Sequence, residues 1–163
     1  MTSMKIRDVM NVKPITVQAD DAISEAAKVL RENKISGMPV LDGEKVVGIV
    51  SESDLLRLLA VSDEGEGSLW LPSPFEVFEV PFRDFVKREK MRSSIDEIPN
   101  KKVSDVMSRN LHEVSPEDTI EYASAIMTRH RINRVPVIEN GRMVGIVTRG
   151  DIISGLGTQH AED

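Results

Sequence analysis

Two short stretches of the chain carry residue types that could bind a small molecule: a hydroxyl residue followed three positions later by an aspartate. Ser51 and Asp54 form one pair, and Thr148 and Asp151 form the other. Each pair follows an apolar Gly-Ile-Val run, typical of a buried strand, and opens a segment with helical periodicity. Such a junction presents free backbone N–H groups and the positive end of the helix dipole. There the hydroxyl could donate to a phosphate, and the carboxylate could accept from both hydroxyls of a ribose.

The same spacing also has a purely structural explanation. A hydroxyl residue at the N-cap and an acid at N3 form a capping box, which stabilises a helix by about 1 kcal/mol. A capping box prefers Glu or Gln at N3 because the longer side chain reaches the cap, whereas both pairs here use Asp. That choice, made twice at a potential anion site, favours ligand binding.

The two pairs belong to an internal repeat. Sliding the chain by 97 positions aligns residues 5–54 with residues 102–151 without a gap, and 16 of these 50 pairs are identical. Pro39/Pro136 and Gly48/Gly145 are among them. We therefore divide the chain into a first repeat at residues 1–60, an inserted segment at 61–100 and a second repeat at 101–163.

Each copy predicts the same order of elements, β-α-β-β-α, after a short amphipathic turn. Brief strands are expected at 15–17 and 111–114, and a helix from Asp20 or Asp21 to about Asn33. The following strands are joined by the hairpin dipeptides Asp42-Gly43 and Asn140-Gly141, and closing helices begin at Ser51 and Thr148. The long helices are expected to bury Ile23, Ala26, Ala27 and Leu30 in one copy and Ile120, Ala123, Ser124 and Met127 in the other, where Asp118 and Glu121 approximate a capping box.

The predicted fold class is therefore α/β (α+β), with the two β-α-β-β-α repeats packed with pseudo-twofold symmetry, because about 55 residues alone would bury little core. The insert departs from the pattern: residues 62–68 are acidic and Gly-rich and predict a mobile loop, and a helix is expected from Arg83 to Ile98. Trp70 and all four Phe residues lie between or within these parts. Such a segment could cover the module's own apolar surface, join a dimer or bind a partner.

Composition, net charge and the spacing of the histidines argue against several classes of function. Hydrophobic residues make up 40% and charged residues 29%, as in a soluble globular protein, and cysteine is absent. No apolar run approaches the ~18–20 residues of a membrane span, so we expect a cytoplasmic protein without a membrane partner. The net charge of −6 makes nucleic acid unfavourable as a partner. His112, His130 and His160 lie far apart in sequence with no catalytic triad or metal-ligand spacing, so neither an enzyme nor a metal site is expected.

The doubled unit resembles a known family. Its "MPV" and "VPV" strands and its Gly-h-h-[Ser/Thr]-x-x-Asp motif, where h is hydrophobic, are similar to a tandem pair of CBS domains, a Bateman module, over residues 4–60 and 101–157. The resemblance implies two repeats packed sheet to sheet about a pseudo-twofold axis, with two clefts that bind adenosine compounds. AMP, ADP, ATP, S-adenosylmethionine and methylthioadenosine are the ligands implied, as is pairing into disc-shaped homodimers.

The resemblance also implies roles for individual residues. Asp54 and Asp151 match the ribose-binding aspartate, and Ser51 and Thr148 match the hydroxyl residue near the phosphate. The adenine would lie against Ile35, Ser36, Gly37 and Met38 in the cleft of Asp151, and against Ile132, Asn133, Arg134 and Val135 in the cleft of Asp54. Arg134 matches a basic, phosphate-binding position in relatives such as the γ subunit of AMP-activated kinase.

The two copies differ in charge at equivalent positions. Arg134 and Arg149 in the second copy stand where the first has Gly37 and Glu52, and a guanidinium can clamp a phosphate whereas a carboxylate repels it. We therefore expect the cleft of Asp151, Thr148 and Arg149 to be the better site. The expected function is a non-catalytic, homodimeric sensor of an adenosine ligand, acting on an unknown downstream protein. The alternative is a scaffold or nucleic-acid accessory protein without a small-molecule ligand.

Overall fold

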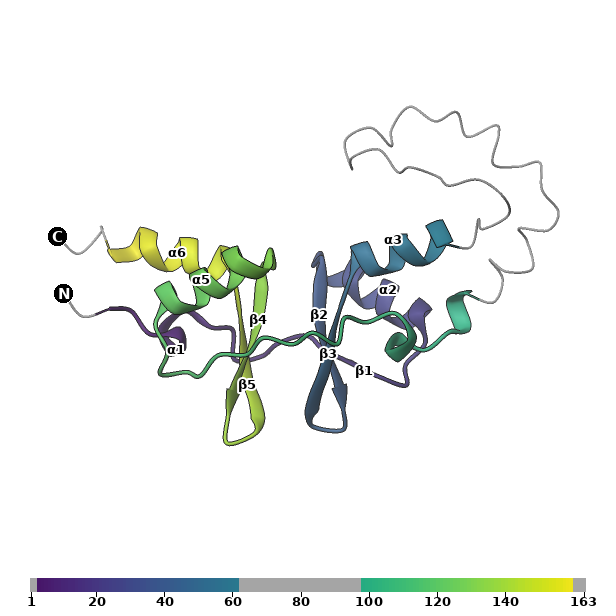
Figure 1. The fold of residues 1–163 in the computed structure, drawn as a ribbon, viewed down its shortest axis with the longest axis horizontal. Helices are drawn as coiled ribbons and strands as arrows, with labels where there is room; N and C mark the ends of the chain where they lie inside the picture. Colours follow the sequence, from purple (N-terminus) through teal and green to yellow (C-terminus); the bar gives the residue numbers. More distant parts are fainter. Residues whose placement is uncertain (1–2, 62–97, 160–163) are drawn as a thin grey trace, which may run out of the picture.

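The computed structural model describes residues 3–61 and 98–159, which form two similar halves lying side by side (Figure 1). Mixed α/β architecture with two repeated units confirms the predicted fold class. The first half contains β1 (Val17–Gln18), α2 (Ile23–Asn33), β2 (Gly37–Asp42), β3 (Lys45–Ser51) and α3 (Glu52–Val61). The second contains α5 (Ile120–His130), β4 (Arg134–Glu139), β5 (Arg142–Thr148) and α6 (Arg149–Gln159), and the remaining elements are α1 (Ile6–Val9), η2 (Ile98–Asn100) and η3 (Val103–Asp105).

The first strand of each repeat is shorter than expected. In the first half, β1 pairs parallel with β2 through two residues, and β2 pairs antiparallel with β3. In the second half, the strand expected at 111–114 is reduced to a single parallel bridge between Val114 and Val137, beside the β4–β5 hairpin. The hairpins are therefore the main sheet structure of both halves.

The long helices begin later than the sequence suggested, because the aspartates close the preceding turns instead. Asp21 accepts from the backbone N–H of Gln18 at 2.9 Å, and Asp118 accepts from that of Ser115 at 2.7 Å. The N-caps are Ala22 and Thr119, so the expected capping box of Asp118 and Glu121 does not form. Ala27, expected in the buried face of the helix, is exposed.

One hairpin turn also differs from expectation. Asn140 and Gly141 both have positive φ, 53° and 77°, as a type I′ turn requires. In the first repeat the turn residues are Gly43 and Glu44, and of these only Gly43 has positive φ. Asp42 instead stays in the strand, where it pairs with Lys45, so the turn is shifted by one residue relative to the expected dipeptide.

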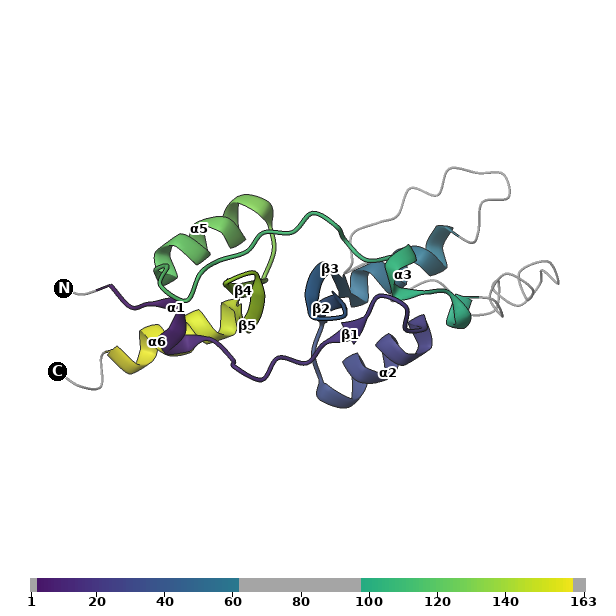
Figure 2. The same ribbon diagram turned by 90° about the horizontal axis from the view of Figure 1, so that it is seen from below.

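The segment that leads into each repeat packs on the other half. We call residues 4–11 and 101–108 the leading segments; in Figure 2, α1 lies beside α6, and the η3 region lies beside α2 and α3. Ile6 N donates to Asp118 O at 2.9 Å, and its counterpart Val103 N donates to Asp21 O at 2.9 Å. Ile6 is fully buried in the core of the second half, and Val103 is fully buried in that of the first. Each core is thus completed by the other repeat.

The leading segments also bond to the hairpins of their partner halves. Asn11 and Ile146 exchange two backbone hydrogen bonds of 2.8 and 3.0 Å, and Ser108 and Ile49 exchange two of 2.8 and 3.0 Å. These pairs are related by the 97-residue offset, so the structure has the internal twofold regularity of the sequence.

Residues 62–97, which include Trp70, all the Phe residues and most of the expected helix at 83–98, lie outside the described residues. Ile98, the last residue of that expected helix, begins η2 and is buried. No helix in the described ranges is long and apolar enough to cross a membrane.

Gly48 gives a direct test of the close contact between repeats. A Cβ added there would lie 2.6 Å from Met107 Sδ and 2.8 Å from the backbone oxygen of Ser108. We expect Gly48→Ala to lower the free energy of unfolding by about 1–3 kcal/mol, the usual cost of overpacking, in urea denaturation. Gly157→Ala is the matched control, because a Cβ there meets nothing within 4 Å. A Gly48→Ala variant as stable as Gly157→Ala would contradict the close contact between Gly48 and the leading segment at 101–108.

Candidate functional site

Both hydroxyl–aspartate pairs have the geometry of a helix cap. Asp54 Oδ2 accepts from the backbone N–H of Ser51 at 2.8 Å and from its hydroxyl at 3.0 Å. Asp151 Oδ2 accepts from the N–H and hydroxyl of Thr148, both at 2.8 Å. The aspartate N–H groups point back to the hydroxyls, at 3.4 Å for Asp54 and 3.2 Å for Asp151. The shorter acid therefore does reach the cap, and capping accounts for one carboxylate oxygen in each pair.

The second carboxylate oxygen distinguishes the two pairs. Asp54 Oδ1 accepts from Arg57 Nη2 at 2.7 Å, and the Asp54 side chain is only 9% exposed. Asp151 is half-buried, and its Oδ1 accepts no hydrogen bond within the described part of the chain. The first pair is thus a buried carboxylate with an attached cation, whereas the second is a cap alone.

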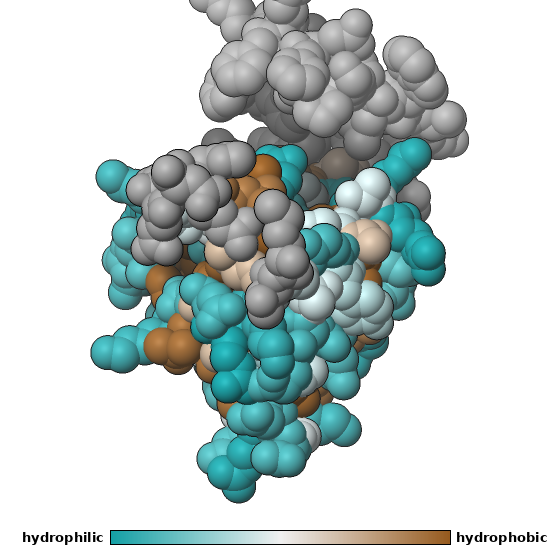
Figure 3. All heavy atoms as spheres, turned by 90° about the vertical axis from the view of Figure 1, so that its left-hand side faces the viewer, coloured by the Kyte–Doolittle hydropathy of each residue, from teal (hydrophilic) through white to brown (hydrophobic). Residues whose placement is uncertain are grey.

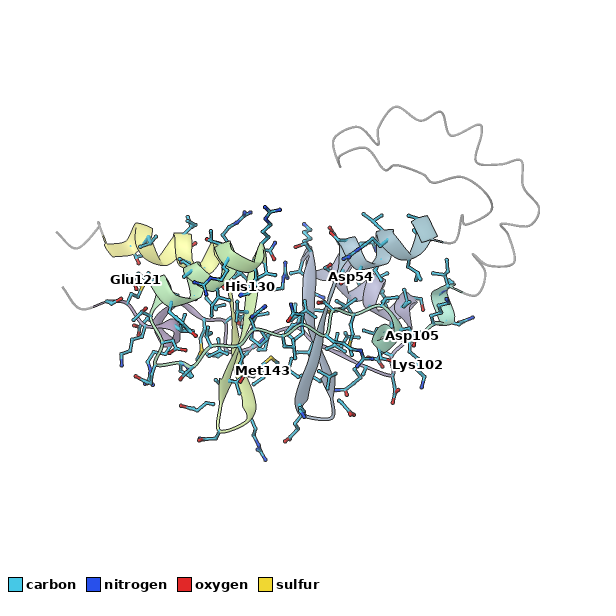
Figure 4. The ribbon with its side chains drawn as sticks, viewed as in Figure 1. Asp54, Lys102, Asp105, Glu121, His130 and Met143 are labelled. Carbon is cyan, nitrogen blue, oxygen red and sulfur yellow. The ribbon has the colours of Figure 1, made fainter. Side chains whose placement is uncertain are left out.

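A cavity of about 890 Å³ lies between the two halves next to Asp54. This volume falls in the range of roughly 300–1,000 Å³ that is usual for small-molecule sites. Figure 4 labels Asp54 and His130 in the two facing halves on either side of this region. Of the predicted site residues, the cavity is lined by Ser36, Ser51, Asp54, Ile132, Asn133, Arg134 and Arg149.

The lining of this larger cavity is rich in cations. Arg57 comes from the first half, and Arg131, Arg134 and Arg149 come from the second, against the two carboxylates of Glu52 and Asp54. Four positive charges against two negative ones leave a positive site on a chain whose net charge is −6. Burial lowers the pKa of the Arg134 guanidinium, and the Glu52 carboxylate opposes that shift. Glu52 therefore partly balances Arg134, and Arg57 is paired with Asp54. Arg131 and Arg149 make no ion pair with another described residue, so their guanidinium groups are available to an anion.

The cavity beside Asp151 is much smaller, about 120 Å³, below the usual size of a ligand site. Of the predicted site residues, it is lined by Ile35, Gly37, Arg134, Thr148 and Asp151. Arg134 reaches into it and donates to the carbonyl of Gly37 and the hydroxyl of Ser36. A Cβ on Gly37 would lie 3.2 Å from the Arg134 guanidinium carbon, so the glycine makes room for this arginine.

The structure places several predicted site residues elsewhere than expected. Arg149 was expected beside Asp151 but lines the larger cavity with Asp54, and so does Ser36. Met38 and Val135 line neither cavity, because both are fully buried within the two cores. The expectation that the Asp151 cleft is the better site is therefore not supported by the shape of the two cavities.

The larger cavity is also lined by residues that were not predicted as site residues, among them Arg57, Arg131 and His112. Arg57 stands one helical turn after Asp54, so its spacing could have revealed it. Arg131 is the C-cap residue that follows α5, with a positive φ of 54°, as its counterpart Lys34 is the C-cap of α2, with 53°. His112 lines the cavity and stacks on His130, although the two are distant in sequence. Within residues 3–61 and 98–159, no group of three acidic, His or Cys side chains could hold a metal.

Comparison with known proteins gives consistent matches over almost the whole chain. The family model described as CBS domain matches residues 6–61 and 103–157. The uncharacterized protein MJ1426 of Methanocaldococcus jannaschii is 39% identical over 155 residues, covering 94% of this chain and 91% of that protein. An inosine-5′-monophosphate dehydrogenase of Korarchaeum cryptofilum is 32% identical over 151 residues, which are 92% of this chain but only 23% of the enzyme.

Solved structures match with similar coverage. The crystal structure of CBSX2 in complex with AMP has a TM-score of 0.68 at 25% identity, covering 95% of this chain and 97% of that one. The CBS domain pair of protein MJ0100 in complex with 5′-methylthioadenosine and S-adenosyl-L-methionine has a TM-score of 0.66 at 25% identity, covering 94% and 99%. Both likenesses extend over two repeats.

The hydrogen bonds that Arg134 makes between the two repeats can be tested by their effect on stability. Arg134→Ala removes hydrogen bonds to Gly37 and Ser36 across the two repeats, so we expect a loss of about 1–3 kcal/mol in unfolding free energy by urea denaturation. Arg142→Ala is the control, because Arg142 is 75% exposed and lies 3.6 Å from an exposed Glu44, a pair worth little. Equal stability of the two variants would mean that Arg134 does not join the repeats energetically.

Proposed function

The chain belongs to the CBS-domain family, as a tandem pair with a segment inserted between the repeats, and we therefore propose that it is a regulatory module that binds an adenosine nucleotide. The proposed site is the larger cavity, between Asp54 of the first half and Arg131, Arg134 and Arg149 of the second. The observation that carries the proposal is this cavity, in which a buried hydroxyl–carboxylate pair faces a cluster of arginines. Similar domain pairs crystallised with AMP or with methylthioadenosine and S-adenosyl-L-methionine support the ligand class.

The charge of the cavity favours a ligand with phosphate. Four arginines and two carboxylates leave an excess of positive charge, and guanidinium groups bind phosphate through paired hydrogen bonds. S-adenosylmethionine offers the arginines one carboxylate but also carries a positive sulfonium and ammonium, and methylthioadenosine has no anionic group, so both match this cluster less well than a phosphate does. Among the adenosine compounds, AMP, ADP and ATP therefore fit the site best.

The Asp54 carboxylate retains capacity for a ribose. A carboxylate has about four acceptor positions, and here the Ser51 N–H, the Ser51 hydroxyl and Arg57 take three. A ribose hydroxyl can occupy the remaining position, and a second can replace Arg57, which is then free to meet the phosphate. Binding would thus move Arg57 without disturbing the cap of α3.

The lining of the cavity supports a regulatory role, because its arginines and the capped Asp54 carboxylate can bind and orient a nucleotide. A ligand held by both halves favours arrangements in which they stay close, and such differential binding is what a signal to another protein requires. The downstream protein would read that change.

We also propose that two copies pair through α3 and α6. Leu56 and Leu59 on α3 are 65% and 51% exposed, and their counterparts Ile153 and Leu156 on α6 are 63% and 45% exposed. Figure 3 shows hydrophobic side chains reaching the surface of the second half among hydrophilic ones. Because the two sets are related by the internal twofold regularity, α3 of one copy can face α6 of the next in a closed pair.

The nucleotide proposal is tested by titration calorimetry on nucleotide-stripped protein with AMP, ADP, ATP, S-adenosylmethionine and methylthioadenosine, and GTP as a control. We expect Asp54→Ala to weaken nucleotide binding by about 10–100-fold, because it loses charge-assisted bonds to the ribose. Asp151→Ala is the matched control: it loses the same kind of cap, about 1 kcal/mol of stability, but retains affinity.

Two outcomes would overturn this assignment. If Asp151→Ala loses affinity and Asp54→Ala does not, the smaller cavity is the site. If the unaltered protein binds none of the adenosine compounds, both pairs are caps only, and a scaffold role, or an accessory role on nucleic acid, becomes the better explanation.

The pairing is tested by the mass of the particle in solution. We expect light scattering to give twice the chain mass for the unaltered protein and a single chain for Leu56→Glu with Ile153→Glu, because buried carboxylates would face an apolar partner. Val12→Glu, at a residue 63% exposed outside both helices, should leave the pair intact. Dissociation by Val12→Glu, or a dimer that survives the double substitution, would contradict this interface.

A further inference from the structure

His112 has a buried polar atom without a partner at the edge of the larger cavity. Its side chain lines the cavity, and its Nε2 is shielded from solvent yet makes no hydrogen bond. It is the one such side-chain atom among the described residues. Leaving a buried polar group unpaired costs free energy, so native proteins keep such groups mostly where a ligand or water completes them.

The ring of His112 is held in place by His130. The two imidazoles stack with their centroids 3.7 Å apart and their planes 22° apart. His130 is the last residue of α5, and its side chain is exposed. Partial loss of hydration, followed by the charges of His112 and Arg129, lowers the pKa of His130, which favours its uncharged ring. That ring lies flat against His112 and supports it on one face.

The strand register places His112 beside the segment that opens β4. Val114 bridges Val137 in parallel, and its N–H donates to Pro136 O at 3.1 Å. His112 stands two residues before Val114 in sequence, and it lines the larger cavity together with Arg134 and Pro136 of β4. Ile132, Pro136 and Met127 line the same cavity and are apolar, so this wall suits an aromatic ring better than a phosphate.

The repeat provides a built-in comparison. The residue 97 positions before His112 is Ile15, and Ile15 lines the smaller cavity. Equivalent wall positions therefore carry an imidazole in the larger cavity and an aliphatic side chain in the smaller one. This difference changes the hydrogen-bonding chemistry of the wall with little effect on the shape of the fold.

We infer that His112 hydrogen-bonds the nitrogen-bearing edge of the nucleotide's base and so determines which bases the larger cavity accepts. The inference rests on the proposed function, because it assigns the part of the ligand that Asp54 and the arginines leave unbound. A purine edge offers ring nitrogens as acceptors and an amino group as donor, and a neutral imidazole nitrogen can meet either. The charged groups nearby are Arg129 and Arg131 at the end of α5, Arg134 on β4 and Glu113 on the same segment.

The test compares His112→Ile, which installs the residue of the first repeat, with His112→Gln, which keeps an uncharged hydrogen-bonding group. AMP binding is measured by calorimetry at pH 8 and at pH 6. We expect His112→Ile to bind AMP about tenfold more weakly at pH 8, the value of one hydrogen bond to a buried group. We expect His112→Gln to retain most of the affinity. His130→Ala, which removes only the support, should give a smaller loss.

Thermal unfolding of the free variants checks that they fold. Replacing an unpartnered nitrogen by an aliphatic group should leave the melting temperature of His112→Ile unchanged or raised. Equal AMP affinity of His112→Ile and the unaltered protein would overturn the inference. Equal losses of AMP affinity in His112→Ile and His112→Gln would also overturn it. If that equal loss is the same at pH 8 and pH 6, His112 contributes packing alone. If it is larger at pH 6, a protonated imidazole contacts the phosphate instead of the base. If the unaltered protein does not bind AMP, the result contradicts the proposed function itself, and it is distinguished in this way from a failure of the His112 inference alone.

Discussion

The exchange of leading segments between the repeats is the constraint on which the structure depends. Ile6 belongs to the core of the second half and Val103 to that of the first, and both are fully buried. Deleting either leading segment would open a hole in the opposite core as well as remove backbone bonds. The two halves are therefore tied to one another, and the cavity between them is lined by residues of both.

Within this symmetric frame, a few substitutions make the two clefts different. The caps at Ser51 and Thr148 are nearly identical, yet one cavity is about 890 Å³ and the other about 120 Å³. Arg134 accounts for much of the contrast, because it lines both cavities and reaches across to Gly37 from the second repeat. A single side chain thus reduces one cleft while adding positive charge to the other.

The sequence was sufficient to predict the repeated architecture, the hairpins and the residues at the two strand-to-helix junctions. These follow from apolar periodicity, from the turn dipeptides, and from the 97-residue offset that relates the two repeats. The prediction of the first residue of α2 was wrong, because packing decides which of several adjacent residues caps a helix. Asp21 closes the preceding turn, and Ala22 is the N-cap. The cavity that Arg149 lines also differs from the expected one, because the direction of a side chain between the halves depends on how the halves pack. The stacking of His112 on His130 has no local signature at all.

The exchanged segments have a consequence for the origin of the fold. Two separate chains of a single repeat, each lending its leading segment to the other, would build the same two cores as a domain-swapped dimer. Such an ancestor must have two equal clefts, because every substitution in it appears twice. Once the copies are joined in one polypeptide, each copy can change independently of the other. Arg134 beside Gly37, and His112 at the position equivalent to Ile15, are differences that a pair of identical chains cannot have.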